Sequence, residues 1–191
     1  IEIGGSYEDQ QEMFGDLIML LAMIIILVYI VMASQFESFM SPFVIMFSIP
    51  FAFVGVLLGL WVTGTPLGTM GMIGILILMG IVVKNGIVLI DYTILMRERG
   101  KSVAEASVIA AKSRLRPILM TTLTTVLGMV PMAIGQGEGS EMWRSLGMVV
   151  AWGLSISTLV TLVIIPTVYA SMASWQERRA AKKLAKKAAK A

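Results

Sequence analysis

Five long runs of apolar residues dominate this 191-residue chain and set what it can fold into. A membrane-spanning helix needs about 20 apolar residues to cross a hydrocarbon core of roughly 30 Å, and each run is close to that length or longer. The runs lack the strict apolar–polar alternation of membrane β-strands. We therefore predict an all-α membrane protein. The five predicted spans are residues 17–33, 42–62, 67–95, 117–134 and 146–172.

The composition removes several classes of chemistry. Hydrophobic residues make up 57% of the chain and charged residues 14%, and there is neither cysteine nor histidine. Thiolate and imidazole metal sites and cysteine nucleophiles are thereby excluded. No Gly-rich phosphate loop of the Walker type occurs, so ATP hydrolysis is not predicted. We expect no enzyme activity, no metal and no cofactor, and any proton chemistry must use carboxylates, lysine or hydroxyl groups.

Lysine and arginine cluster in two places, which orients the predicted spans. Basic residues within and next to the membrane concentrate on the cytoplasmic side, so we expect the N-terminus on the periplasmic side and the C-terminus in the cytoplasm. Residues 1–16 would be a periplasmic-side lead-in, 17–172 the transmembrane domain and 173–191 a basic tail. Clusters placed between apolar runs indicate contact with membrane lipid, not with nucleic acid. The first cluster comprises Arg97, Arg99, Lys101, Lys112, Arg114 and Arg116, and the second comprises Arg178, Arg179, Lys182, Lys183, Lys186, Lys187 and Lys190.

Two further expectations concern the ends of the spans. Residues 102–113 contain good helix formers, and Ser102 with Glu105 has the spacing of a capping box, so we predict a short interfacial helix there. The chain begins with acidic residues on the outer side and has no signal peptide. We therefore interpret it as a piece of a longer protein whose earlier part has already crossed the membrane.

Lys84, near the middle of the third span, is the main candidate for function. A lysine at the centre of a membrane helix costs about 2.5–3.5 kcal/mol on insertion scales and normally faces a partner or water. The alternative is a side chain that snorkels to the surface, but the headgroups lie roughly 10–15 Å from a mid-span position. We favour a functional role.

The chain does not offer Lys84 a close carboxylate. Asp91 is on the same helical face but about 10 Å farther along the axis, and no other acid lies inside the five predicted spans. We interpret Asp91 as an interfacial residue beside Arg97 and Arg99, with a proton-carrying role as the alternative. The counter-charge of Lys84 is therefore expected on a helix outside this chain.

Hydroxyl groups and glycines complete the candidate residues. Thr121 lies on one face of the fourth span, with Thr122 beside it, and the alternative for each is a local bond to the preceding turn. Small residues let helices approach closely, so we assign a packing role to five glycines. Sixteen methionines scatter over the spans, which favours apolar filling over thioether metal ligands. The glycines are Gly55, Gly59, Gly71, Gly74 and Gly80.

Several blocks of sequence, in order, resemble the resistance-nodulation-division permeases, and more specifically their hydrophobe and amphiphile efflux branch. The chain would correspond to the last five of twelve transmembrane helices, as a C-terminal fragment that lacks the first seven helices and both periplasmic porter regions. The matching blocks are Ala33–Ser38, Pro42, Ile49–Pro50, Gly80–Tyr92, Arg114–Thr122 and Gly128–Pro131.

The resemblance implies a trimeric, proton-driven exporter of the bacterial inner membrane, working with a periplasmic adaptor and an outer-membrane channel. It implies a proton relay made by Lys84, Asn85, Arg114 and Thr121, with Asp91 and Thr122 as accessory residues. In the family the lysine engages an aspartate pair on a helix that this chain lacks. The partner of this chain would thus be the missing N-terminal half, and the energy source the proton gradient.

Two alternatives stay open at this point. Export of heavy metals is a second transport function, although no methionine pair with acids occurs within the spans. A non-transporting structural remnant or a designed helical bundle is an alternative of another class.

Overall fold

The computed structural model describes residues 3–135, 137 and 139–188, and within these ranges it contains helices and no strand. Five helical segments are long and apolar enough to cross a membrane, which confirms the predicted all-α class with five spans. Residues 1–2 of the predicted lead-in and 189–191 of the predicted tail lie outside the described ranges. The helices are α1 (Ile3–Phe36), α2 (Met40–Met46), α3 (Ser48–Thr63), α4 (Thr69–Glu98), α5 (Val103–Ile134) and α6 (Ser140–Ala188).

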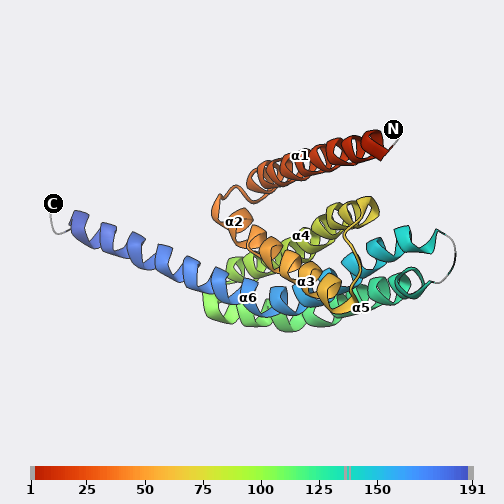
Figure 1. The fold of residues 1–191 in the computed structure, drawn as a ribbon. Coiled ribbons are helices and arrows are strands. Elements are labelled where there is room, and N and C mark those ends of the chain that lie inside the picture. The colour runs from red at the N-terminus through yellow and green to blue at the C-terminus, as the bar shows by residue number, and fades with distance from the viewer. Residues whose placement is uncertain (1–2, 136, 138, 189–191) are drawn as a thin grey trace.

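Helix α6 is the element around which the bundle is built. It packs extensively against α3, α4 and α5, and its side chains Val149, Val150 and Leu154 are completely buried. Figure 1 shows α6 crossing the bundle and continuing well past the ends of its neighbours. The described part of the predicted tail is therefore a direct continuation of the fifth span.

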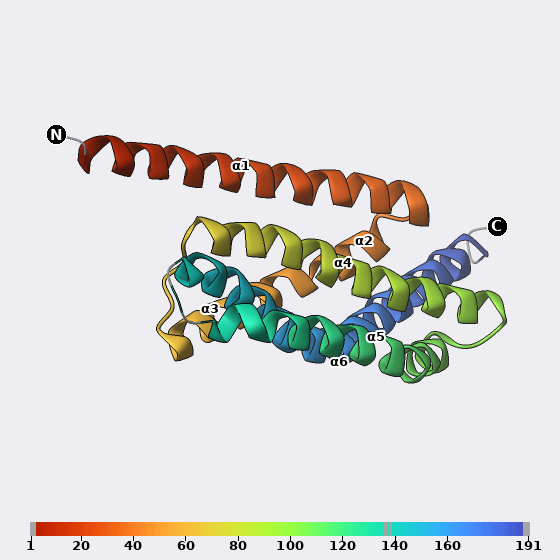
Figure 2. The same ribbon diagram turned by 90° about the vertical axis from the view of Figure 1, so that its right-hand side faces the viewer.

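Helix α1 lies along one side of this bundle, as Figure 2 shows. It contacts α2 and α4, and Met32 is its one fully buried hydrophobic side chain among those described. Only 6% of its most apolar segment is buried, against 56% for α4. Helix α1 therefore keeps apolar side chains on the outside of the bundle, as expected of a helix that faces lipid or further helices.

The second span consists of two helices, because the chain breaks once at Phe47 between α2 and α3. Pro50 lies in the first turn of α3, where a missing backbone N–H removes no helical hydrogen bond. The hydroxyl of Ser48 donates to the carbonyl of Ile45 at 2.6 Å across the break. Helix α3 then ends at Gly64, whose φ of +61° suits glycine and closes the helix.

Helix α5 corrects the sequence-based boundaries. The predicted capping box is present: the hydroxyl of Ser102 accepts from the Glu105 N–H, and the Glu105 carboxylate accepts from the Ser102 N–H. However, residues 103–113 do not form a separate interfacial helix but continue into the fourth span without a break. Pro117 therefore lies inside α5 and not in its first turn. A proline removes one hydrogen bond from a helix interior, and the strong cap and the packing on α6 tolerate this loss.

Four of the five glycines singled out in the sequence lie at close helix contacts. A Cβ atom at Gly55 would lie 3.0–3.2 Å from atoms of Ile156, Gly153 and Trp152 on α6. Gly59 meets the side chain of the same tryptophan, while Gly71 and Gly74 face Ser145 and Val149 of α6.

Gly80 differs from the other four glycines, because it is exposed and no heavy atom lies within 4 Å of an added Cβ. The expected packing role of Gly80 therefore has no contact in the part of the chain that the structure describes. The reason is that Gly80 lies on an exposed side of α4 that does not face α6.

We predict that Gly55→Val destabilises the bundle by about 1–3 kcal/mol, because the added atoms would overlap the backbone of α6. Gly128→Val is the matched control, since Gly128 is exposed on α5 and has no neighbour within 4 Å of an added Cβ. Unfolding of both variants in mixed micelles measures the difference. Equal stabilities would show that the α3–α6 contact does not depend on this glycine.

Candidate functional site

Lys84 occupies the middle of α4, as its sixteenth residue in a helix of 30. Its side chain is exposed at the bundle surface. Among the described residues, the one ion pair joins Arg97 to Glu177 at 2.7 Å, so Lys84 has no carboxylate partner there. Lys84 therefore lies at the middle of its helix, with no carboxylate partner among the described residues.

Lys84 belongs to a row of exposed residues along one face of α4. At about 100° per residue, Ile77, Gly80, Lys84, Asp91 and Leu95 fall within a sector of about 60°, and all five are exposed. We call this row the open face of α4. The other side of the same helix is buried and apolar, and it carries Val82, Val83, Leu89 and Ile90.

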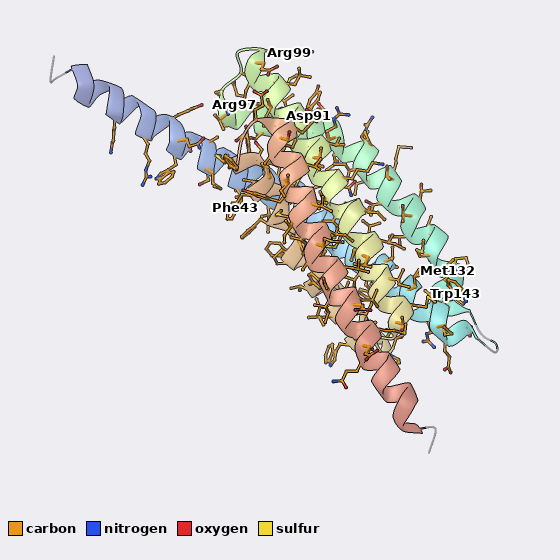
Figure 3. All side chains as sticks on the ribbon, turned by 90° about the horizontal axis from the view of Figure 1, so that it is seen from above. Phe43, Asp91, Arg97, Arg99, Met132 and Trp143 are labelled. Atoms are coloured by element: carbon orange, nitrogen blue, oxygen red, sulfur yellow. The ribbon has the colours of Figure 1, made fainter. Side chains whose placement is uncertain are left out.

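Asp91 lies on the open face, two turns beyond Lys84 or about 10 Å along the axis. Figure 3 shows it toward the end of the bundle that carries Arg97 and Arg99, with Met132 and Trp143 at the opposite end. Asp91 is exposed and makes no ion pair among the described residues. The arrangement thus offers a cation at mid-span and an anion nearer the basic end.

Arg114 connects this region to α5. Its guanidinium carbon lies 4.7 Å from the centre of the Tyr92 ring of α4, within cation–π distance. The Arg114 side chain is half-buried, and its Nε atom is buried without a hydrogen-bond partner among the described residues. Arg114 and Thr121 are seven residues apart and therefore share one face of α5.

The remaining candidates divide between the open side and the interior. Asn85 is buried, on the flank of α4 next to the open face. Thr121 is exposed, and its hydroxyl donates to the Pro117 carbonyl of its own helix at 2.9 Å. Thr122 is buried instead and pairs with the hydroxyl of Thr158 on α6 at 3.1 Å. Thr121 is thus accessible to a partner, whereas Thr122 bridges two helices.

Sequence reasoning missed three contacts, two of them near the site and one at the start of α4. The stacking of Arg114 on Tyr92 and the Thr122–Thr158 bridge are two of them. The third is Ser145 on α6, which donates to the Pro66 carbonyl at 3.1 Å and accepts from the Gly68 N–H at 3.4 Å. The run of hydroxyl residues in the fifth span, at Ser155, Ser157 and Thr158, is a signal that would have pointed to the second contact.

We predict that Thr122→Val lowers the stability of the bundle by about 0.6–1.7 kcal/mol, because Thr158 then loses its partner in an apolar setting. Thr121→Val should change stability by less than about 0.5 kcal/mol, since its hydroxyl is exposed and bonds only within α5. Denaturation in mixed micelles compares the two. The double variant Thr122→Val/Thr158→Val should regain part of the loss, and a strictly additive loss would contradict a direct bridge.

Ionisable residues within membrane helices mark ion and substrate pathways, so a helical fold with five candidate spans and with Lys84 and Asp91 on one exposed helix face is typical of a membrane transporter. The model of the AcrB/AcrD/AcrF family matches residues 1–173. The chain belongs to this family, the resistance-nodulation-division permeases.

Relatives of the chain have names from different areas of physiology. It is 41% identical over 180 residues to the swarming motility protein SwrC of Bacillus subtilis, and 38% identical over 184 residues to the multidrug resistance protein MdtC of Proteus mirabilis. It is also 36% identical over 166 residues to the cobalt-zinc-cadmium resistance protein CzcA of Cupriavidus metallidurans. These alignments cover 87–94% of this chain but only 16–18% of each relative.

A solved structure agrees with the fold. The crystal structure of a heavy metal efflux pump superposes with a TM-score of 0.79 at 32% identity, covering 88% of this chain and 16% of that protein. The chain therefore spans less than a fifth of the length of the proteins it resembles. Its helices are arranged as in a small part of a much larger pump.

Proposed function

We propose that this segment forms the lysine side of the proton relay in a proton-driven exporter of the bacterial inner membrane. One observation carries the proposal: Lys84 lies at mid-span on an open face, without a carboxylate partner among the described residues. An ammonium group in hydrocarbon requires a counter-charge or water. We infer that the remainder of the parent protein supplies carboxylates that pack against the open face of α4.

The proposed coupling step is a change of partner by Lys84. When the facing carboxylates are ionised, they hold the ammonium group; when they take up protons, the attraction is lost. The ammonium then turns toward Asn85 and Thr121. The Thr121 hydroxyl donates to Pro117 and can still accept a hydrogen bond from the lysine. The altered pairing changes how α4 packs against the carboxylate helix and so couples proton uptake to the transport cycle.

The proposal extends to orientation and partners. Helix α1 would begin on the periplasmic side and α6 would end in the cytoplasm, as the two basic clusters indicate. The parent protein would be a homotrimer that works with a periplasmic adaptor and an outer-membrane channel. The proton gradient would be its energy source, and no cofactor is proposed.

We expect Lys84→Ala to abolish proton-coupled export by the complete parent protein, because protonation of the facing carboxylates would then release nothing. Export from inverted vesicles under an imposed proton gradient measures this, and membrane insertion should be unchanged. Lys101→Ala is the matched control, since Lys101 is exposed in the link between α4 and α5. Full export by the Lys84 variant would contradict the proposed role of Lys84 in the relay.

For the substrate we propose drugs or other amphiphiles. The multidrug relative supports this class, and within the described residues no group of three or more histidine, cysteine, aspartate or glutamate side chains could hold a metal ion. Heavy-metal export is the second candidate, supported by the cobalt-zinc-cadmium resistance relative and by the heavy metal efflux pump structure.

The two substrate classes differ in what the complete parent protein protects against. We expect its expression in a sensitive strain to raise tolerance to cationic dyes and bile salts several-fold, with tolerance to Zn²⁺, Co²⁺ and Cd²⁺ unchanged. A strain that expresses the Lys84→Ala protein is the control. Protection against the metals alone would overturn the amphiphile assignment in favour of the second candidate.

A further inference from the structure

The charge and the N–H donors of the Arg114 guanidinium are only partly matched by the residues around it. A guanidinium stays protonated in proteins, so it carries a charge into the apolar bundle permanently. Among the described residues the single ion pair belongs to Arg97 and Glu177, which leaves Arg114 without a carboxylate. Its buried Nε–H also lacks an acceptor there.

Within the described part of the chain, Tyr92 makes a cation–π contact with this charge. The guanidinium carbon lies 4.7 Å from the ring centre, where the negative face of the ring attracts a cation. Contact with a ring face uses none of the five N–H donors of arginine. The stacking therefore orients the guanidinium and leaves its donors available.

The position of Tyr92 on α4 suits this task. Its ring is partly buried and packs against the main apolar cluster of the bundle, which holds it in place. Its neighbour Asp91 lies on the open face with Lys84. Tyr92 itself lies on the flank of α4, about 80° around the helix axis from Lys84. On α5, Arg114 shares its face with the exposed Thr121. The Tyr92–Arg114 contact thus joins the flank of α4 to the face of α5 that carries Thr121.

We propose that Tyr92 is a positioning residue that holds the Arg114 guanidinium at the edge of the open face, with its N–H donors directed to a carboxylate of the remaining protein. This inference rests on the proposed function, because it assumes that carboxylates pack there. Tyr92 acts through its ring and not through its hydroxyl group.

The test uses the complete parent protein in proteoliposomes, with export rates measured between pH 6 and 8.5. Tyr92→Leu should lower the rate about 3- to 30-fold, the range that a cation–π contact spans. A well-placed guanidinium lowers the pKa of a facing carboxylate. A displaced guanidinium raises that pKa, so the carboxylate releases its proton at higher pH. The pH of half-maximal rate should therefore rise by about half a unit or more.

The ring requirement is tested with substitutions that preserve shape. Tyr92→Phe should keep both the rate and the pH profile. Increasingly fluorinated phenylalanines at position 92 should reduce the rate step by step, because fluorine weakens the negative ring face while the side chain still fits. Tyr29→Leu is the matched control, since Tyr29 is a half-buried tyrosine of α1, a helix that does not contact α5 within the described residues. It should leave the pH profile unchanged.

The outcomes separate this inference from the proposed function. A Tyr92→Phe protein as impaired as Tyr92→Leu would overturn the ring as the cause, and so would a fluorinated series without a trend. A loss of protein level with an unchanged pH profile would show a merely structural role. If Lys84→Ala abolishes export while Tyr92→Leu leaves the export rate and its pH profile unchanged, this inference alone fails. If Lys84→Ala exports normally, the proposed function fails first.

Discussion

The cost of a charge in hydrocarbon is the constraint on which the other features of this bundle depend. An unpaired lysine at the centre of a membrane helix is unfavourable by several kcal/mol, and the chain nevertheless keeps Lys84 there. The charge that carries this cost lies on the open face of α4, while the opposite face of the same helix is apolar and buried. The two faces of this helix thus differ in role. The inner face packs against the rest of the bundle, and the outer face carries a lysine that has no carboxylate partner among the described residues.

The packing that supports this arrangement comes mainly from α6. Glycines on α3 and α4 let α6 approach closely, at Gly55 and Gly74 for example. Hydroxyl pairs add directional contacts that lipid tails cannot compete with, as at Thr122 and Thr158. A membrane bundle has no hydrophobic effect between its helices, so close van der Waals contact and such bridges must hold it. Lys84, which is exposed, therefore lies on a bundle whose packing contacts are made by other residues.

The sequence is informative about this fold where a single physical quantity decides the outcome. Apolar length fixes the number of spans, and the Ser102–Glu105 spacing fixes the start of α5. The isolation of Lys84 also follows from the sequence, because Asp91, the one acid within the predicted spans, lies about 10 Å farther along the helix axis. Boundaries were harder to predict: the predicted fourth span begins at Pro117, but α5 runs through this proline although a proline inside a helix removes one hydrogen bond and crowds the preceding turn. The contacts of Arg114 and Thr122 depend on how helices rotate against each other, which no local pattern contains.

Gly80 affects how closely another helix could approach α4 beside Lys84. It lies one turn from the lysine, is exposed, and leaves bare backbone on the open face. Helix axes usually stay about 8–10 Å apart, but a glycine lets them come closer. The exposed backbone at Gly80 would therefore let a further helix approach α4 closely beside Lys84.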